Sequence, residues 1–342
     1  MGPKTIRIRD VAKAAGVSTA TVSRAISNPE LLTEATRDVV FEAIRSTGYR
    51  VNKAARNLRK RQAGAVLILV PNLGNPFFSQ IIAGMSEAFA QRDYSILVAD
   101  TMGNRSGDDQ FMDYFLDSRV DGMICLDGGL TLQDFGQLEA NGMAGRVVFA
   151  CEWVDGASFP SVRSDNVEGA RLAVRHLYEL GHRKIAHITG PHDNILTGAR
   201  RQGMVEERTR LGLPVRDEWI IRGDFSLESG REAAEKILKM EERPTAVFCA
   251  SDQVAFGLIS ALTANGVRVP EDMSVVGFDD IELSDFYVPA LTTIRQDRPA
   301  LGLKAASLLL DCLNGKTSMI QSAEPVVLDV ELVVRQSAAR IQ

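Results

Sequence analysis

The stretch GVSTATVSR, residues 16–24, joins a helix-breaking glycine to a run of small hydroxyl side chains and a single arginine. Around it, across residues 9–47, apolar residues recur at helical spacing and predict three short helices. Gly16 is expected to end the first helix. Ser18 and Thr33 are expected to cap the second and third, because a side-chain oxygen at a helix start accepts a hydrogen bond from an unpaired amide. Two helices joined by a tight turn and braced by a third are typical of a helix-turn-helix.

In a helix-turn-helix, the second helix enters the major groove of DNA by its N-terminal residues. Spacing places Val17 and Val22 toward the first helix and leaves small and basic side chains on the outer face. Arg24 can donate two hydrogen bonds to guanine, a contact worth about 1–3 kcal/mol of discrimination. A generic helical hairpin with a polar face is the alternative. The residues predicted to contact DNA in this segment are Ser18, Thr19, Ala20, Thr21, Ser23, Arg24 and Asn28.

The charge of the chain is divided unevenly. Residues 1–62 hold 13 Lys and Arg against 5 Asp and Glu, a net charge of +8. Subtracting these from the chain totals of 39 and 44 leaves 26 against 39, a net charge of −13, for residues 63–342. A charge step that coincides with a change of sequence pattern indicates a separate basic module with an anionic partner.

The segment NKAARNLRKRQAG, residues 52–64, predicts a short helix that Asn52 is suited to cap. Its length is about two turns, and isolated helices below roughly 12–15 residues are marginal in water, so we expect order only when it is bound. Leu58 stands among basic residues, where solvation gives an apolar side chain no advantage. A wedge that opens a base step in the minor groove explains this leucine; a charged interdomain linker is the alternative.

From Gly64 onward, short β-branched apolar runs alternate with helical stretches. Such runs are typical of parallel strands covered on both faces by helices. The pattern repeats around residue 165, which predicts two similar α/β lobes, each a doubly wound parallel sheet. The predicted strands are residues 65–70, 95–99, 122–126, 147–150, 185–189, 246–250 and 274–278.

Ligands of doubly wound sheets bind beyond the carboxyl ends of the strands. Those ends carry aromatic side chains suited to stacking on a flat or pyranose-like face, carboxylates suited to accepting hydrogen bonds from hydroxyls, and an arginine suited to donating to a carbonyl or ring nitrogen. A core position is the alternative for Phe77 and Phe78, and Asp280 is suited to capping a turn. The predicted small-molecule site consists of Phe77, Phe78, Trp153, Arg200, Phe225, Asp252 and Asp279.

Motifs for catalysis and metal binding are missing from the sequence. There is no P-loop, G-x-G-x-x-G, G-x-S-x-G or H-E-x-x-H pattern, and the four histidines lack metal-ligand spacing. Adjacent Asp279 and Asp280 would point to opposite faces of one strand and make a poor acid/base pair. The four cysteines are far apart, so we expect buried thiols. We therefore expect no enzyme activity, no cofactor and no metal.

No apolar run is long enough to cross a membrane, and the basic start lacks the apolar stretch of a signal peptide. These features predict a cytoplasmic protein with no membrane partner.

Several segments resemble the lactose/galactose repressor family of bacterial transcription regulators. IRDVAKAAGVSTATVSRAISNP resembles the family's DNA-binding headpiece, ARNLRKR its hinge helix, and VPNLGNPFFSQII, GHRKIAHITGP, SDQVAFG, VPEDMSVVGFDDIELSDF and PALTTIRQ its effector-binding core. The resemblance implies a homodimer on a near-palindromic operator and a core similar to periplasmic sugar-binding proteins. It also implies base-reading roles for Thr19, Ala20 and Arg24, intercalation by Leu58, and a minor-groove contact by Arg59.

Within the family, STATVSRA, PFFSQIIAGM, RGDFSLESG and PTAVFCASD are most similar to the cytidine repressor branch. The family's sugar-responsive members usually have an arginine where Gly198 stands, and its purine-responsive branch has a basic residue and a threonine in place of Asn194 and Leu196. These differences from the sugar-responsive and purine-responsive members favour a nucleoside effector over a simple hexose. The branch also suggests a co-regulator on the DNA.

The sequence therefore predicts a DNA-binding transcriptional regulator, a repressor, whose operator affinity is controlled by a small effector. Its expected parts are a helix-turn-helix domain (1–50), a hinge helix and linker (51–63), and a core (64–342). The expected lobes of the core are 64–164 with 297–324, and 165–296 with 325–342. A free sugar or sugar phosphate is the alternative effector. A small-molecule-binding protein without a DNA role is a more distant alternative.

Overall fold

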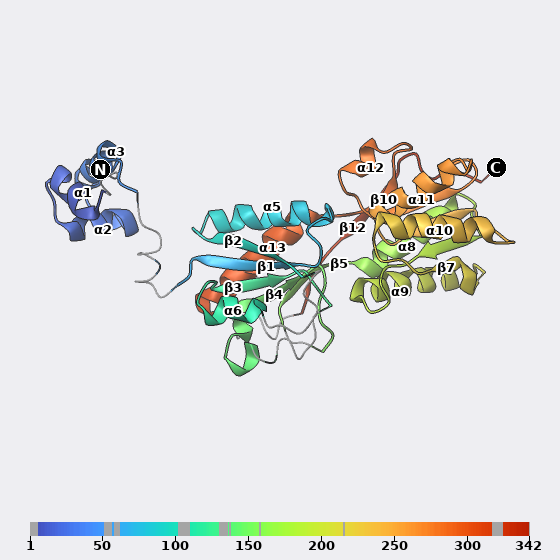
Figure 1. The fold of residues 1–342 in the computed structure, drawn as a ribbon, viewed down its shortest axis with the longest axis horizontal. Coiled ribbons are helices and arrows are strands. Elements are labelled where there is room, and N and C mark those ends of the chain that lie inside the picture. The colour runs from blue at the N-terminus through green and yellow to red at the C-terminus, as the bar shows by residue number, and fades with distance from the viewer. Residues whose placement is uncertain are drawn as a thin grey trace. The chain divides into compact units, whose positions relative to one another are not determined.

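The computed structural model divides the chain into two compact units, Met1–Ala63 and Gly64–Gln342. It describes residues 6–50, 57, 62–101, 110–129, 136, 138–156, 159–214, 216–316 and 324–341. Figure 1 shows a small helical unit and a larger unit built on two sheets.

Three helices and a short 3₁₀ turn form the first unit. They are α1 (Ile8–Ala15), α2 (Thr19–Ser27), η1 (Pro29–Leu31) and α3 (Glu34–Thr47). Apolar residues of all three helices are buried together, with Val11, Val22 and Val40 fully covered and Val17 packed against the cluster. This small core confirms the helical spacing read from the sequence.

The predicted helix boundaries of this unit are confirmed. Gly16 follows α1 in the left-handed conformation, at φ 65°, which a residue without a side chain adopts at little cost. The Ser18 hydroxyl accepts a hydrogen bond from the amide of Thr21, and the Thr33 hydroxyl accepts one from the amide of Thr36. These caps fix where α2 and α3 begin.

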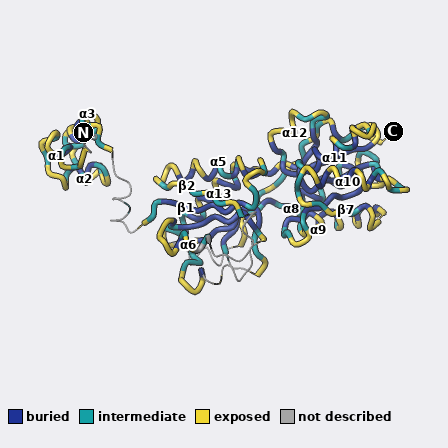
Figure 2. The backbone as a smooth tube through the Cα atoms, viewed as in Figure 1, coloured by how far each residue is buried: buried dark blue, intermediate teal, exposed yellow. Residues whose placement is uncertain are grey.

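The first sheet of the larger unit has the strand order β11-β5-β4-β3-β1-β2, with every pair parallel. One face is covered by α5 (Phe77–Ala90) and α13 (Arg298–Asp311), and the other by α6 (Gln110–Leu116), as Figure 1 shows. The alternating residues of strand β1, which lies between β3 and β2, pack on opposite faces, and all of them are buried (Figure 2). The strands are β1 (Ala65–Val70), β2 (Ser95–Asp100), β3 (Gly122–Cys125), β4 (Val147–Ala150), β5 (Ser161–Ser164) and β11 (Val326–Leu328).

The second sheet has the order β12-β10-β9-β8-β6-β7, parallel except that β12 runs antiparallel to β10. Helices α10 (Leu227–Lys239) and α11 (Asp252–Ala264) cover one face, and α8 (Asn166–Glu179) and α9 (Ile195–Arg210) cover the other. The strands are β6 (Ile185–Ile188), β7 (Ile220–Ile221), β8 (Ala246–Cys249), β9 (Ser274–Asp279), β10 (Thr292–Gln296) and β12 (Val330–Val333). Each sheet with its helices is one lobe.

The seven predicted strands are confirmed, and five further strands were not predicted. These five are short or polar: SVRS in β5, II in β7, TTIRQ in β10, VVL in β11 and VELV in β12. They lie at or next to the sheet edges, where one side is less covered and a continuous apolar run is not needed.

The chain passes between the lobes three times, at the residues that follow β5, β10 and β11. Strand β11 pairs with β5 in the first sheet, and β12 pairs with β10 in the second. The last crossing therefore lies at Asp329, later than the boundary expected after residue 324. Backbone pairing with β5 assigns β11 to the first lobe. The sequence of a three-residue apolar strand does not indicate which sheet the strand joins.

Helices α5 and α13 approach so closely that glycine is required at their contact. A Cβ on Gly302 would lie 2.0 Å from the carbonyl oxygen of Ile81, and one on Gly84 would lie 2.3 Å from the carbonyl oxygen of Pro299. The two glycines thus let the backbones of the helices touch and hold α13 against the first sheet.

Gly302→Ala is expected to lower the free energy of unfolding by about 1–3 kcal/mol, because the helices must separate to admit the methyl group. The urea midpoint of the full chain measures this change. Gly198→Ala is the matched control: this helical glycine of α9 has no atom within 4 Å of a built Cβ, so alanine is expected to leave the protein as stable or slightly more stable. Equal destabilisation by the two changes would contradict the close-contact interpretation.

Candidate functional sites: the outer face of α2 and the cavity between the lobes

The residues predicted to contact DNA lie on one helix and its caps. Thr19, Ala20 and Arg24 are exposed, and Thr21 and Ser23 are half-buried. Ser18 and Asn28, which flank α2 at its two ends, are exposed as well. Within the described residues, the Arg24 guanidinium makes no hydrogen bond or ion pair. The structure thus presents a polar helical face with one available cation, as an element that reads base edges requires.

The predicted intercalating residue Leu58 and its neighbour Arg59 lie outside the described residues. Asn57, near the end of the first unit, is described, and its side-chain amide donates to the carbonyl of Ala63 at 2.9 Å. The roles of Leu58 and Arg59 stay predictions from the sequence and the resemblance.

A cavity of about 410 Å³ lies between the two lobes of the larger unit. Its lining includes five of the seven predicted site residues: Phe77, Phe78, Arg200, Phe225 and Asp279. The first lobe contributes residues after β1, β3 and β4, and the second contributes residues after β6, β7, β8 and β9. All these segments follow carboxyl ends of parallel strands, where ligands of such sheets bind.

Aromatic side chains come from both lobes. Phe77 and Phe78 begin α5 and meet edge to face, with ring centroids 5.2 Å apart, so they line the cavity and also pack into the core. Phe225 stands on the loop before α10 with φ at 69°. A left-handed backbone costs a residue with a side chain of order 1–3 kcal/mol, and such strain is concentrated at ligand sites. The cavity lining thus contains aromatic side chains from both lobes.

The floor of the cavity holds a buried carboxylate beside a buried guanidinium. An Nη2 atom of Arg200 lies 3.7 Å from Oδ1 of Asp279, and Gln296 donates to the same oxygen at 2.8 Å. Arg200 also donates through Nε to Asn166 at 2.9 Å and through Nη1 to the carbonyl of Ala250. Nε and Nη1 of Arg200 are therefore bonded to protein groups. The Arg200 side chain holds the residues of the cavity floor in place and also lines the cavity.

Glu152 is a lining residue that the sequence analysis did not identify. It directly follows Cys151 at the end of the first sheet, accepts a hydrogen bond from Asn194 at 2.9 Å and another from the amide of Gly128 at 2.7 Å. Burial raises the pKa of the Glu152 carboxyl, and the two hydrogen bonds oppose that shift. Since Asn194 belongs to the second lobe, its bond to Glu152 ties the lobes together across the cavity.

Further polar residues of the lining were also missed by the sequence analysis. Gln253 of the second lobe donates to Asn75 of the first at 3.0 Å, a second bond between the lobes. The other missed polar residues are Asn72, Asp127, Asp224, Ser226 and Ser251. Asn72, Asp127, Ser251 and Gln253 follow predicted strands, so a broader choice of polar residues there would have found them. Asp224 and Ser226 follow β7, a strand that the sequence did not predict.

Two predicted site residues do not line the cavity, which corrects the prediction. Asp252 is fully buried and accepts hydrogen bonds from Ser284, Thr293 and the amide of Ile281. It stabilises the start of α11 and the loop after β9, and no oxygen remains for a ligand. Burial raises the pKa of this carboxyl.

Trp153 is the second correction. Its ring lies under the guanidinium of Arg163, with the Arg163 Cζ atom 3.9 Å from the ring centroid, and its indole nitrogen donates to Asp155 at 3.2 Å. The neighbouring residue Glu152 enters the cavity instead. Sequence position identified the right segment, but the direction of each side chain depends on the backbone turn after β4.

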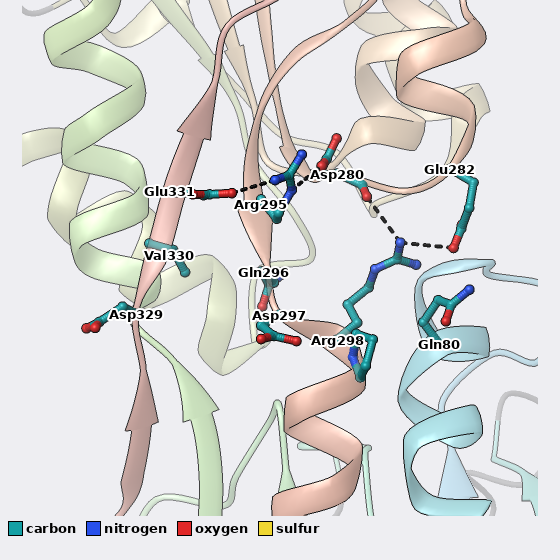
Figure 3. Close-up of a pocket in the computed structure, with 11 residues that line it drawn as sticks. Gln80, Asp280, Glu282, Arg295, Gln296, Asp297, Arg298, Asp329, Val330 and Glu331 are labelled. Carbon is teal, nitrogen blue, oxygen red and sulfur yellow. Dashed lines mark hydrogen bonds and ion pairs between the residues drawn. The ribbon is translucent and has the colours of Figure 1, made fainter. Parts of the chain in front are cut away.

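Asp280 does not line the cavity between the lobes; it lies in a separate pocket, shown in Figure 3, where it joins residues near the crossings of the chain. Arg295 donates to Asp280 at 2.6 Å and to Glu331 at 2.5 Å, and Arg335 donates to Asp280 at 2.7 Å. Arg298 donates to the Asp280 carbonyl at 3.1 Å and to Glu282 at 3.2 Å. Asp280 is thus an ion-pairing residue rather than a turn cap.

The cysteines and His187 lie in the interior of the protein. Cys125, Cys151, Cys249 and Cys312 are buried free thiols, as expected. His187 is fully buried, and its ring stacks on Phe248; burial lowers its pKa to about 4. Within the described residues, no group of three or more His, Cys, Asp or Glu is arranged to hold a metal ion, and no helix there is long and apolar enough to cross a membrane.

Comparison with family models matches both units. Residues 7–52 match the model of bacterial regulatory proteins of the lacI family, and residues 174–338 match a periplasmic binding protein-like domain. A helix-turn-helix joined to a two-lobed core with an interlobe cavity defines the class of ligand-responsive DNA-binding regulators.

Relatives and solved structures cover nearly the whole chain. The HTH-type transcriptional repressor CytR of Escherichia coli (strain K12) is 38% identical over 96% of this chain and 95% of its own. The repressor PurR of Haemophilus influenzae (strain PittEE) is 33% identical over 98% of this chain and 99% of its own. The lac repressor dimer bound to operator and the anti-inducer ONPF is 32% identical, with a TM-score of 0.83 over 98% of this chain and 100% of that one.

The chain therefore belongs to the LacI family of bacterial regulatory proteins. It is a DNA-binding transcriptional repressor with a small-molecule effector, and not an enzyme. The class, the fold and the resemblance predicted from the sequence are confirmed.

Proposed function

We propose that this repressor binds its operator as a homodimer in the cytoplasm and that its effector is a nucleoside, with cytidine as the first candidate. The observation that carries the nucleoside proposal is the composition of the interlobe cavity: aromatic rings from both lobes together with buried hydrogen-bonding groups. A nucleoside has a flat base for the rings and a ribose diol for a carboxylate.

The residues of the cavity suit the two halves of a nucleoside differently. Asp279 accepts hydrogen bonds and is suited to a pair of ribose hydroxyls, as a charge-assisted contact in a buried setting. Glu152 of the first lobe and Asn194 of the second line the same cavity and offer acceptors and donors to the edge of a base. The mixture of aromatic and amide groups fits a base better than the hydroxyl-rich surface of a hexose.

Effector control follows from the two bonds that join the lobes across the cavity, Glu152 to Asn194 and Asn75 to Gln253. A ligand that replaces or strengthens these contacts changes the relative free energies of open and closed lobes. Operator binding is then coupled to the effector by its differential affinity for the two states. The network of ion pairs around Asp280, part of which Figure 3 shows, transmits such closure. Asp280 directly follows Asp279 of the cavity floor, and the network joins it to β10 and to the segment of β12, next to the crossings between the lobes.

Dimer formation has a candidate surface on the second lobe. Leu283, Phe286 and Val288, at α12 (Leu283–Phe286) and just beyond it, expose 49%, 79% and 86% of their surface. A cluster of large exposed apolar side chains on a globular protein marks an interaction site. A second copy of this chain is the occupant that the dimeric lac repressor structure suggests.

The test is calorimetric titration of the full chain with cytidine, uridine, adenosine, ribose, glucose and cellobiose, followed by operator binding with and without the ligand that binds. Saturable binding of a nucleoside, with no saturable binding of the sugars, is expected. Binding of a sugar alone would overturn the nucleoside proposal and establish the alternative effector. A binding ligand that leaves operator affinity unchanged would overturn the proposed control.

The co-regulator on DNA is also tested by operator binding. The co-regulator suggested by the resemblance is expected to bind only where its own site adjoins the operator. The operator affinity of the repressor alone is measured first, and the operator affinity in the presence of the co-regulator is then compared with it.

A further inference from the structure

A second concave surface lies on the second lobe, at the carboxyl ends of β6 and β7 and beside the start of α9. Figure 1 labels β7 and α9 in this lobe. It has a volume of about 280 Å³. Thr189 follows β6, Arg222 follows β7, and Thr197, Gly198 and Arg201 come from the first two turns of α9. The surface shares no lining residue with the cavity between the lobes.

The lining of this surface is basic. Arg201 and Arg222 are exposed, and within the described residues neither guanidinium makes a hydrogen bond or an ion pair. Several other arginines of the lobe are paired with carboxylates, for example Arg175 with Glu207 at 2.8 Å and Arg268 with Asp272 at 2.6 Å. No acidic residue lines the surface. The nearest sequence neighbour with a negative charge is Asp193, which bonds His192 at 2.6 Å and is almost fully exposed.

This local charge is opposite to that of the surrounding core. Residues 63–342 carry a net charge of −13 by the counts given above. Two unpaired guanidinium groups that face one concavity raise the free energy of the free protein through mutual repulsion. A bound anion would remove that repulsion and use the planar donor forks of both groups.

Neutral groups on the same surface complete the environment of an anion. Thr197 is 6% exposed, and its hydroxyl oxygen is buried without a hydrogen-bond partner among the described residues. Gly198 has open space where a Cβ would lie, so a ligand can approach the backbone of the first turn. The Asn194 side chain already accepts hydrogen bonds from the amides of Leu196 and Thr197. The attraction therefore comes mainly from the guanidinium groups and not from the helix end.

We propose that this surface, which we term the β6–β7 anion site, binds a phosphate group, either free or carried by a small phosphorylated metabolite. Arg201 and Arg222 hold the phosphate oxygens, and the first turn of α9 adds polar contacts. The site is a second ligand-binding site of the repressor, distinct from the effector cavity.

Lining residues of the two sites approach each other at Gly190. A Cβ on Gly190 would lie 2.2 Å from the Phe225 ring, which lines the effector cavity, and 2.5 Å from the hydroxyl of Thr197, which lines the second surface. Gly190 thus contacts one lining residue of each site. A phosphate that fixes Arg222 and the first turn of α9 also restrains the loop that carries Phe225, three residues after Arg222.

The experiment is calorimetric titration of the full chain with inorganic phosphate and with ribose 5-phosphate, at constant ionic strength in chloride. Saturable binding is expected, and the double change Arg201→Gln and Arg222→Gln is expected to weaken it at least tenfold. The matched control is Arg231→Gln with Arg340→Gln, which removes two exposed arginines of the same lobe that lie outside the site. This control is expected to bind phosphate as the wild type does.

The outcomes are distinct. Tighter binding of inorganic phosphate identifies the free ion as the ligand, and tighter binding of ribose 5-phosphate identifies a phosphorylated metabolite. No saturable binding of either compound overturns the proposal, as does equal weakening by the control pair, which would reveal only a general charge effect. Phosphate binding is expected to persist in Asp279→Ala. Its loss there would place the phosphate in the effector cavity and overturn the second site, whatever the effector proves to be.

Discussion

Asp279→Ala is expected to weaken cytidine binding by roughly a hundredfold while leaving the protein folded. A hydrogen bond to a charged group contributes about 1.5–3 kcal/mol, and about 1.4 kcal/mol corresponds to a factor of ten in affinity. The change also leaves the buried Arg200 guanidinium without its carboxylate neighbour at 3.7 Å. Calorimetric titration of the full chain gives the dissociation constant directly.

Two further variants separate a ligand contact from a general loss of structure. Asp279→Asn keeps the shape of the side chain and removes its charge, so it is expected to bind cytidine more weakly than the wild type and more tightly than Asp279→Ala. Asp285→Ala removes an exposed carboxylate outside the cavity and is expected to bind normally. Wild-type affinity in Asp279→Ala would exclude this carboxylate from the effector site.

The affinity is also expected to depend on pH. Burial raises the pKa of the Asp279 carboxyl to about 6, against the opposing charge of Arg200. Below that pH the ligand-free protein holds a proton at Asp279, which must leave before the carboxylate can accept two ribose hydroxyls. Cytidine binding is therefore expected to tighten as pH rises through about 6 and to level off above 7. The same raised pKa makes the folded protein bind more protons than the unfolded chain between about pH 4 and 6, so this carboxyl lowers stability as pH rises there.

Arg24→Ala is expected to abolish the preference for guanine at one base pair of each operator half-site. A bidentate contact between arginine and guanine contributes about 1–3 kcal/mol of discrimination, which is roughly a 5- to 150-fold difference in affinity. The side chain is exposed and makes no hydrogen bond or ion pair within the described residues, so its removal leaves the packing of α2 intact. The operator is first selected from random DNA with the wild-type protein, and each variant is then titrated on it and on versions with single base pairs replaced.

Arg45→Ala provides the comparison within the same unit. Arg45 lies on α3 and is already paired with Glu42 at 2.5 Å. Its removal is expected to change affinity slightly and equally on all sequences, since Arg45 lies outside α2, the helix predicted to read base edges. If Arg24→Ala weakened operator and scrambled DNA by the same factor, the base-reading role would be wrong.

The sequence alone determined the class of this protein because the patterns involved are local. Gly16, Ser18 and Thr33 set helix ends through their own backbone and side-chain chemistry, and the structure has those ends where they were predicted. The strands of the sheet interiors, such as residues 65–70, are continuous apolar runs that burial on both faces requires. The charge step near residue 62 and the long family segments needed no tertiary information either.

Tertiary structure alone decided which strand-end residues face the cavity. Glu152 and Trp153 are neighbours in the sequence, yet the turn after β4 directs the carboxylate into the cavity and the indole onto Arg163. Asp252 follows a buried strand and Asp279 ends one. The carboxylate of Asp252, however, accepts three hydrogen bonds, from Ser284, Thr293 and the amide of Ile281. Such partners come from distant parts of the chain, so their effect leaves no local signal.

The position of the last crossing between the lobes and the β6–β7 anion site also depend on contacts between distant parts of the chain. Strand β11 joins the first sheet through pairing with β5, although some 160 residues of sequence lie between them, as the paired positions Val326 and Val162 show. Arg201 and Arg222 line one surface only because α9 begins beside the end of β7. Local sequence fixes which elements form and what chemistry their ends carry. The packing of those elements decides which ends meet, because it depends on contacts between residues that the sequence does not place together.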